Sequence, residues 1–435
     1  MQADSTARML RWAFLPECEA PADGWAVEAF TAIAKVIAGQ SPPSATYNDK
    51  GAGLPFLQGN GDFSFRSPAP TLWCSAPAKT AEKGDTLISV RAPVGEVNRS
   101  DREYAIGRGL AAVRANGCNA DYLYHAMQRW RWSLQRVSQG TTFDAVTARH
   151  FAHLRVAIPK DPTEQASIAR ILDAVDIALE YTRAAVDRAR ELKRAILQDF
   201  YYGALGETAY ADRPRKKLPP GWSLVPTKRL LAEDPQNGVS PEASTQPPGI
   251  PTFSIAAIRD GRVDLNTGEH LKYAHVPEKV VQRYRIRRGD VLIVRGNANS
   301  DLVGKAAMVS SFPEGCIYPD IAKRVVFRAE GDPKVSYEYA VLAWNHPVVH
   351  NQVLRRAKTS NGTLKINNRD VSQIILPVPP ETEQTRLVQL AAVVDAHVDS
   401  LFVIADAQSQ LKKSLMQELL TGRVRVKYEE PAVAS

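Results

Sequence analysis

Two long segments of the chain share one helical pattern of apolar positions. In the first, over 163–203, apolar side chains recur at spacings of three and four residues or their multiples, at Ile168, Leu172, Val175, Leu179, Val186 and Ile196. The second, over 382–422, keeps the same stripe at Leu387, Val394, Val398, Leu401 and Leu415. Neither segment has an internal proline or glycine. Each is therefore predicted to form one long helix that packs along another helix.

The two segments are copies of one another. Residue i of the first matches residue i + 219 of the second, since 382 − 163 = 219, and the match continues without a gap to Gly203 and Gly422. The residues that recur identically are Thr163, Glu164, Gln165, Val175, Asp176, Asp187, Leu192, Lys193, Gln198 and Gly203. At about 1.5 Å per residue, some 40 residues make a rod of roughly 60 Å.

A region of about 160 residues with mixed strand and helix signals precedes each predicted helix. Both regions open with a Gly-Trp pair, in 21–25 and 218–222, and both contain a Gly-Asp turn that leads into an apolar strand, in 83–97 and 288–309. In each, an aromatic-rich helical stretch, a small polar loop and a strand ending in prolines follow. The order domain, helix, domain, helix thus accounts for almost all of the chain.

Composition and charge narrow the class of protein. Among 435 residues, Lys and Arg outnumber Asp and Glu by 55 to 47, so the net charge is +8. This charge favours association with a polyanion such as nucleic acid. The four cysteines lie too far apart for a CxxC zinc pair or a dense disulfide framework. No run of 18 or more apolar residues and no secretory signal pattern occurs, so we expect a cytoplasmic protein without a membrane span.

The repeated segments are the most specific motifs in the sequence. PKDPTEQASIARILDAVD and PPETEQTRLVQLAAVVD, with the later ELKRAILQDFYYG and QLKKSLMQELLTGRV, resemble the specificity subunit of type I restriction-modification systems. The resemblance covers roughly residues 20–425. It implies an α+β fold with a pseudo-two-fold internal repeat, in which two globular α/β target recognition domains are separated by two long antiparallel coiled-coil helices.

The resemblance gives the expected boundaries and target. The parts are a first target recognition domain at 1–160, a central spacer helix at 161–203, a linker at 204–217, a second target recognition domain at 218–379, a distal spacer helix at 380–422 and a C-terminal tail at 423–435. Each domain is expected to read one half of a split DNA site. Because the two domains differ greatly in sequence, the expected target is asymmetric and bipartite.

The same resemblance implies partner subunits and implies that the catalytic sites are on these partners. The expected partners are double-stranded DNA, two methyltransferase subunits docked on the repeated helices, and restriction/translocase subunits. The sequence has neither Asn-Pro-Pro-Tyr nor Asp-Pro-Pro-Phe, the signatures of adenine methyltransferases. We therefore expect a non-catalytic subunit with no cofactor of its own. S-adenosylmethionine is expected on the methyltransferase subunit, and ATP and Mg on the restriction subunit.

Base readout requires Arg, Lys, Asn or Gln, or small hydroxyl side chains, on elements that enter a groove. Candidates in the first domain are Arg91, after an apolar strand, and Gln139, Thr141 and Thr142 in a polar loop. Candidates in the second are Arg295, Asn297, Asn299 and Lys305 after the corresponding strand, and Ser360, Asn361, Thr363 and Lys365 in the later loop. For any one of them, a solvated loop side chain is an equally good interpretation. Relative to the Gly-Asp turn, Arg91 falls one residue later than Arg295.

Other basic residues suit phosphate contacts or simply solvate a face. They are Arg283, Arg285, Arg287 and Arg288, then Arg355, Arg356 and Lys358, and then Arg129, Arg131 and Arg136. Trp130 and Trp132 flank Arg131 and could stack on bases, although aromatic residues on a helical stretch are more often part of the core.

Two alternative functions stay open at this point. Pro319-Asp320 with Asp332-Pro333-Lys334 fits a loose nuclease pattern, in which two carboxylates hold Mg²⁺ and the lysine assists the nucleophile. Such a short pattern often arises by chance. The other alternative is a structural adaptor whose long helices hold partners together without reading DNA.

Overall fold

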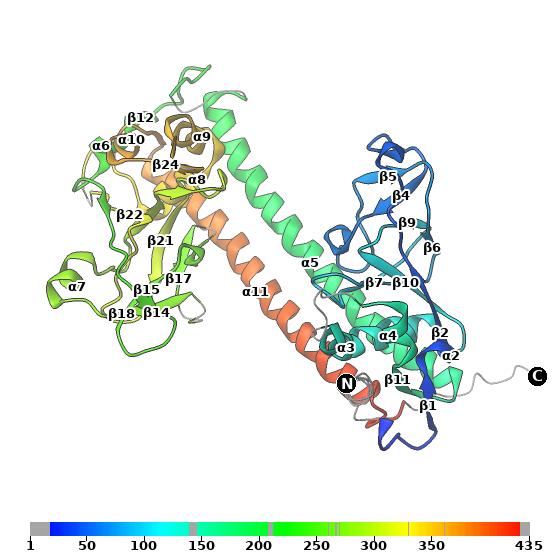
Figure 1. Ribbon diagram of the computed structural model, residues 1–435. Helices are drawn as coiled ribbons and strands as arrows, with labels where there is room; N and C mark the ends of the chain where they lie inside the picture. The colour runs from blue at the N-terminus through cyan, green and yellow to red at the C-terminus, as the bar shows by residue number, and fades with distance from the viewer. Residues whose placement is uncertain are drawn as a thin grey trace, which may run out of the picture. The chain divides into compact units, whose positions relative to one another are not determined.

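The computed structural model describes residues 18–138, 146–207, 212–259, 261–265, 268, 270–328, 330–360 and 362–426. It divides into two compact units, unit 1 (Met1–Val186 and Ser400–Ser435) and unit 2 (Asp187–Asp399). The division falls inside the two long helices, α5 (Pro162–Leu205) and α11 (Glu381–Leu419), so each unit contains part of both (Figure 1). The two predicted helices are thus confirmed, with bounds that differ from the expected ones by at most three residues.

Local chemistry explains where α5 begins and ends. The Asp161 carboxylate accepts a hydrogen bond from the Thr163 N–H at 2.8 Å, and Pro162 occupies the first helical position, where a missing N–H costs nothing. The sequence places the helix end at Gly203, but Gly203 lies inside the last turn. The helix continues to Leu205 and ends before Gly206, whose φ of +99° suits a residue without a Cβ.

In unit 1, a small pair of strands joins the globular part to α5, because β1 (Trp25–Ala29) pairs antiparallel with β11 (Arg155–Pro159) directly before the helix. One further sheet has the order β2-β10-β7-β8 and the other β3-β5-β4-β9-β6. Their strands are β2 (Ala34–Ala38), β3 (Tyr47–Asn48), β4 (Leu54–Leu57), β5 (Leu72–Cys74), β6 (Thr80–Ala81), β7 (Thr86–Ser89), β8 (Val97–Arg99), β9 (Tyr104–Ile106) and β10 (Leu110–Ala115). The short helices are α2 (Phe30–Ile33), α3 (Ala120–Ser138) and α4 (Ala148–Ala152).

Unit 2 repeats this plan, because β12 (Ser223–Pro226) pairs antiparallel with β25 (Ile375–Val378) directly before α11. Its sheets have the orders β13-β22-β19-β21-β17-β16, β14-β18-β15 and β20-β24-β23. Their strands are β13 (Gln236–Asn237), β14 (Ala243–Ser244), β15 (Ile250–Phe253), β16 (Ile258–Arg259), β17 (Arg262–Asp264), β18 (Leu271–Ala274), β19 (Val291–Val294), β20 (Gly296–Asn297), β21 (Ala306–Ser311), β22 (Ala322–Val325), β23 (Lys358–Ser360) and β24 (Thr363–Lys365). The helices are α6 (Thr227–Leu230), α7 (Glu278–Tyr284), α8 (Tyr337–Asn345), α9 (Pro347–Arg356) and α10 (Asn368–Ser372).

Each unit has its own core, and each core includes both long helices. In unit 1, Phe30 and Trp130 pack with Ile168 of α5 and with Leu419 of α11. In unit 2, Trp344 packs in one cluster with side chains of both helices, represented by Tyr201 and Leu387. Trp130 is only 1% exposed, which confirms the core interpretation of this residue over base stacking.

The sequence Thr-Glu-Gln (TEQ) occurs at 163–165 and again at 382–384, and the contacts of its glutamine explain the repetition. In unit 1, the buried Gln165 donates from Nε2 to the Pro159 carbonyl oxygen at 2.8 Å, and its Oε1 accepts from the Asn119 N–H at 2.7 Å. Pro159 is the last residue of β11, and Asn119 directly precedes α3. One side chain therefore joins the strand, the aromatic helix and the long helix.

The equivalent glutamine makes the same contacts in unit 2. Gln384 donates from Nε2 to the Pro379 carbonyl oxygen at 2.9 Å and accepts from the Ser336 N–H at 3.0 Å. Ser336 is the N-cap of α8, just as Asn119 accepts from the Tyr122 N–H at the start of α3. Because these amide groups are buried, their hydrogen bonds must be made inside the protein.

An identical ion pair also occurs in each unit between the two long helices. In unit 1, the Lys412 ammonium of α11 lies 2.7 Å from the Asp176 carboxylate of α5, and in unit 2 the Lys193 ammonium of α5 lies 2.7 Å from the Asp395 carboxylate of α11. Repeat position 176 matches 395, and 193 matches 412. A second ion pair in unit 1 joins Arg425, just after the end of α11, to Glu164, near the start of α5. The two long helices therefore run antiparallel there.

Helix α11 is long and apolar enough, by length and composition, to cross a membrane, which the sequence pattern does not predict. One such helix is weak evidence for a membrane span. Within unit 2, its carboxylates at Asp395 and Asp399 pair with Lys193 and Arg262, so this part of the helix packs against protein.

Candidate nucleic-acid interface

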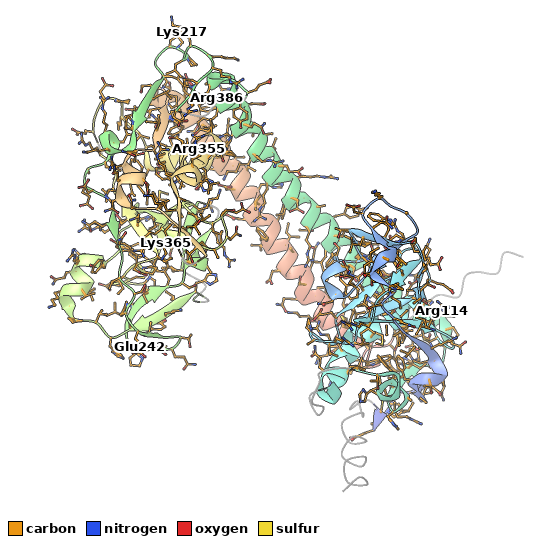
Figure 2. The ribbon with its side chains drawn as sticks, turned by 45° about the horizontal axis from the view of Figure 1, so that its top comes forward. Arg114, Lys217, Glu242, Arg355, Lys365 and Arg386 are labelled. Atoms are coloured by element: carbon orange, nitrogen blue, oxygen red, sulfur yellow. The ribbon has the colours of Figure 1, made fainter. Side chains whose placement is uncertain are left out.

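In unit 2, the two stretches that the sequence singles out meet in one sheet. Strand β20 pairs antiparallel with β24, and β24 pairs with β23. The register places Gly296 opposite Lys365 and Asn297 opposite Leu364. Figure 2 shows Lys365 between Arg355 and Glu242 along unit 2. The predicted residues are therefore neighbours in space, whereas their contact with bases stays a prediction.

Arg295 lies directly before this sheet and is held from two sides. Its carbonyl oxygen accepts from the Ile366 N–H at 2.9 Å, and its guanidinium lies 3.7 Å from the Asp320 carboxylate, which also accepts from the Ser240 hydroxyl at 2.6 Å. The Arg295 side chain is 26% exposed. A guanidinium held by one long ion pair can exchange this carboxylate for the acceptors of a guanine edge.

The other predicted residues of unit 2 differ in how they are placed. Asn297 accepts from the Asn299 N–H at 2.8 Å, and Asn299 accepts from the Asp301 N–H at 2.9 Å, so both side chains shape the loop. Lys305 is half-buried, and this burial lowers the pKa of its ammonium. Thr363 is half-buried and Lys365 is exposed. Asn361 and the Ser360 side chain lie outside the described residues.

Unit 1 shares one backbone hydrogen bond of this arrangement, with one difference in register. The Val146 N–H donates to the Val90 carbonyl oxygen at 2.9 Å, as the Ile366 N–H does to Arg295. Val90 is thus the structural counterpart of Arg295, which agrees with the one-residue offset of Arg91 in the sequence. Arg91 is exposed directly after this position. Gln139, Thr141 and Thr142 lie outside the described residues.

Among the basic groups, the one around α7 is the most exposed. Its four members, Arg283, Arg285, Arg287 and Arg288, all have exposed side chains, which suits contact with phosphates. In the other two groups, some members have intramolecular partners. Arg355 pairs with Asp212 at 2.9 Å, and Arg131 pairs with Glu96 at 3.0 Å. The Arg136 and Trp132 side chains lie outside the described residues.

Sequence reasoning missed Lys323, a buried cation beside Arg295. Lys323 lies on β22, is 1% exposed, and donates from Nζ to the Asn237 and Asn368 side-chain oxygens at 2.5 and 2.6 Å. It thereby joins β13, β22 and α10. Burial, together with the charge of Arg295, lowers the pKa of Lys323 to about 8. The sequence carries no clear signal for this role, because Lys323 and Arg324 are adjacent basic residues in the middle of the four-residue strand β22.

The lowered pKa of Lys323 predicts a pH effect on stability. The unfolded chain keeps this proton up to the ordinary lysine pKa, 10.5, whereas the folded protein loses it near pH 8, so the unfolded state binds more protons between these values. The contribution of Lys323 to stability should therefore increase as pH rises through this window. We expect the difference in melting temperature, wild type minus Lys323→Gln, to increase from pH 7.5 to pH 9.5. The exposed Lys365→Gln variant is the control, and a pH-independent difference for Lys323→Gln would contradict the assignment.

The residues of the nuclease pattern do not share one site. Asp332 and Lys334 line a cavity of about 320 Å³, and Asp320 is not among its lining residues. Asp320 is instead engaged by Ser240 and Arg295, while the Lys334 ammonium lies 3.5 Å from Glu381. Two carboxylates on one Mg²⁺ would have to lie within a few ångströms of one another.

A cluster of His125, Asp173 and Asp176 in unit 1 has the composition of a metal site, with ligand atoms within 4.8 Å of one another. Cations of the protein already lie beside both carboxylates: Lys412 is 2.7 Å from Asp176, and Arg99 is 3.0 Å from Asp173. We interpret the cluster as an ion-pair network at the junction of α3, α5 and α11.

Comparison with known proteins finds relatives of this chain among type I restriction-modification proteins. Residues 23–186 match the family model of the type I restriction modification DNA specificity domain. This part of the chain, which contains the first globular region and the start of α5, is therefore similar to that specificity domain. The putative type I restriction enzyme MjaX specificity subunit of Methanocaldococcus jannaschii is 36% identical over 165 residues, which is 38% of this chain and 39% of that protein. The type I restriction enzyme EcoKI specificity subunit of Escherichia coli strain K12 is 23% identical over 292 residues, 66% of this chain and 59% of that protein.

The fold of the chain also has a counterpart among solved structures. The S subunit of a type I restriction-modification system from M. genitalium covers 92% of this chain and 96% of its own, with a TM-score of 0.57 at 11% identity. At this identity the likeness concerns the fold. The two structures share mixed α/β content and a long C-terminal helix.

Proposed function

We propose that this chain is the sequence-specific DNA-binding specificity subunit of a type I restriction-modification complex, and that it reads an asymmetric bipartite target. Residues 1–160, most of which lie within the matched range 23–186, supply the first recognition domain, and residues 218–379 supply the second. The two long helices separate the domains as a coiled-coil spacer. The match of residues 23–186 to a DNA specificity domain and the net charge of +8 support DNA as the ligand.

The observation with the most weight is the repetition of one domain-to-helix junction. Each unit uses a TEQ glutamine to hold a strand end and a helix start, and each uses a Lys–Asp pair to join the long helices. The regions attached to these junctions have different loops, with Arg91 in one and Arg295 in the other. A protein with two such regions is suited to two different half-sites.

Partner subunits are part of the proposal, with two methyltransferase subunits docked on the helices and restriction/translocase subunits joining them. Exposed apolar side chains on these helices support a docking role, among them Tyr181 at 73%, Val393 at 70% and Val403 at 71%. Exposed apolar side chains mark an interaction site where they form a contiguous patch. We place the complex in the cytoplasm.

The chain itself is proposed to be non-catalytic and to bind no cofactor. S-adenosylmethionine would bind the methyltransferase subunit, and ATP and Mg the restriction subunit. The alternative is a helical scaffold that does not read DNA. It would not explain why Arg295 and Lys365 lie at one small sheet, so it accounts less well for the structure.

Methylation mapping in the source cell tests this function. Deletion of the gene for this chain should abolish methylation at one bipartite motif, and the gene restored in trans should return it. Unchanged methylation at every motif after deletion would rule out the proposed function. Purified chain that cuts DNA with Mg²⁺, and loses this activity in Asp320→Ala, would favour the nuclease instead.

Replacing Arg295 with alanine should relax one half-site. A bidentate arginine–base contact contributes about 1 to 3 kcal/mol of discrimination, so binding to the correct half-site should fall by this amount while binding to other sequences changes little. The measurement is competition binding with oligonucleotides in which each half-site is changed in turn. Uniform weakening on all sequences would instead identify Arg295 as a phosphate contact.

A further inference from the structure

In unit 1, a loop of the globular region is attached to α5 well beyond the TEQ junction. Arg66, in the loop between β4 and β5, lies 3.3 Å from the Glu180 carboxylate and 3.7 Å from the Asp173 carboxylate. Next to it, the Arg183 guanidinium of α5 stacks over the Phe65 ring, 4.0 Å from its centroid. Two arginines thus attach the loop to the helix: Arg66 from the loop and Arg183 from α5.

In unit 2, an unrelated segment makes the matching attachment to α11. Arg262, the first residue of β17, lies 2.8 Å from the Asp399 carboxylate and 3.6 Å from the Asp395 carboxylate. Glu180 and Asp399 are the same position of the repeat, since 399 − 180 = 219. Each globular region therefore supplies one arginine to the same acidic position of its helix, although β17 and the loop of Arg66 differ in structure.

The two attachments of each region are equally far apart. From the TEQ glutamine to the acidic position is 180 − 165 = 15 residues in α5 and 399 − 384 = 15 residues in α11. At about 1.5 Å per residue, this separation is about 22 Å in both helices. A rigid body attached to a rod at one point can tilt, whereas a second point 22 Å away removes this freedom.

The two kinds of attachment also differ in strength. Gln165 and Gln384 are 3% and 2% exposed, so the first junction is part of the core. The Arg66 and Arg262 side chains are 26% and 45% exposed, and their partners Glu180 and Asp399 are 54% and 61% exposed. Exposed ion pairs contribute little to folding stability, so their removal should leave each unit folded.

We propose that Arg66 and Arg262 are positioning residues that fix the tilt of each recognition domain on its helix, and thereby restrict the spacer length that the protein accepts. This inference rests on the proposed function. Neither residue has to touch DNA. Loss of either arginine frees one domain to tilt, which should allow targets whose half-sites are one base pair nearer or farther apart.

The test is methylation mapping in source cells in which the chromosomal gene encodes Arg66→Ala or Arg262→Ala. In the wild type, we expect methylation at one spacer length. In each variant, we expect methylation at spacers one base pair shorter or longer to rise about threefold, the size of effect that an exposed ion pair can supply, while the base preference within both half-sites is unchanged. Arg108→Ala and Arg259→Ala, which remove exposed arginines of the same units, should keep the wild-type spacer.

A charge exchange shows whether the ion pair itself is responsible. Arg262→Glu combined with Asp399→Arg should restore the single spacer length, whereas Arg262→Glu alone should not. If the alanine variants methylate one spacer length like the wild type, the inference is wrong while the proposed function stands. If their half-site preference changes instead, the arginines read bases and the positioning role is also wrong. Absence of any bipartite motif in the wild type would contradict the proposed function itself.

Discussion

Replacing Asp176 with alanine is expected to destabilise unit 1 by about 3 to 5 kcal/mol, the cost of leaving one member of a buried ion pair without its partner. Asp176 is 1% exposed, and the Lys412 side chain is 16% exposed. Without the carboxylate, the Lys412 ammonium would keep the Gln128 side-chain oxygen, at 2.8 Å, as a neutral partner. Thermal and urea unfolding of the full chain, followed by a probe in unit 1, measures the loss.

Two further variants separate the ion pair from simple packing. Because apolar residues of similar volume often replace a buried ion pair without loss, Asp176→Leu combined with Lys412→Met should recover most of the stability. In unit 2, the matching pair is more exposed, at 21% for Lys193 and 26% for Asp395, so Asp395→Ala should cost about 1 kcal/mol or less. Equal losses for Asp176→Ala and Asp395→Ala would show that burial does not govern the cost.

Lengthening both spacer helices together is expected to lengthen the DNA target. The Lys–Asp positions are equally spaced on the two helices, since 193 − 176 = 17 and 412 − 395 = 17. Four residues inserted between these positions in both helices preserve the match and add about 6 Å of helix, close to two base pairs of DNA. Methylation mapping should then find both half-sites unchanged and the spacer longer by about two base pairs.

The single insertion is the control for this prediction. Four residues added to α5 alone make its spacing 21 against 17 in α11, so the two Lys–Asp pairs cannot both form along continuous helices. We expect this variant to alter the spacer with a lower melting temperature than the doubly lengthened protein. If the matched insertion changes the half-sites, or leaves the spacer as it was, the helices do not act as the ruler.

The long helices could be predicted from the sequence because their apolar stripe is continuous and repeated over some 40 residues. The division of the structure into two units could not be predicted from the sequence. Contacts that group one end of α5 with the opposite end of α11 are made between residues more than 200 positions apart, such as Lys412 and Asp176. The end of α5 was also predicted too early, because Gly203 has the same composition signal as Gly206 but lies inside the helix.

For the candidate interface, the sequence indicates stretches that the fold of unit 2 brings together, but not the residues that lie beside them. That Arg295 and Lys365 lie at one small sheet follows from the pairing of β20 with β24, which local pattern does not determine. Lys323, Arg66 and Arg262 were missed for a similar reason. Each is one basic residue among 55, and its role depends on what the fold places beside it: two asparagine oxygens for Lys323, and a helix carboxylate for each arginine.

The TEQ junction has an evolutionary consequence. Through their amide groups, Gln165 and Gln384 contact only backbone atoms of the globular regions: the N–H before an aromatic helix and the carbonyl oxygen at a strand end, with Gln384 adding the Lys334 carbonyl oxygen. Backbone groups are present whatever the side chains are. Recombination near the two junctions could therefore exchange an entire globular region for a foreign one without any compensating change in the helices. By this route, one scaffold could acquire new DNA targets in a single genetic event.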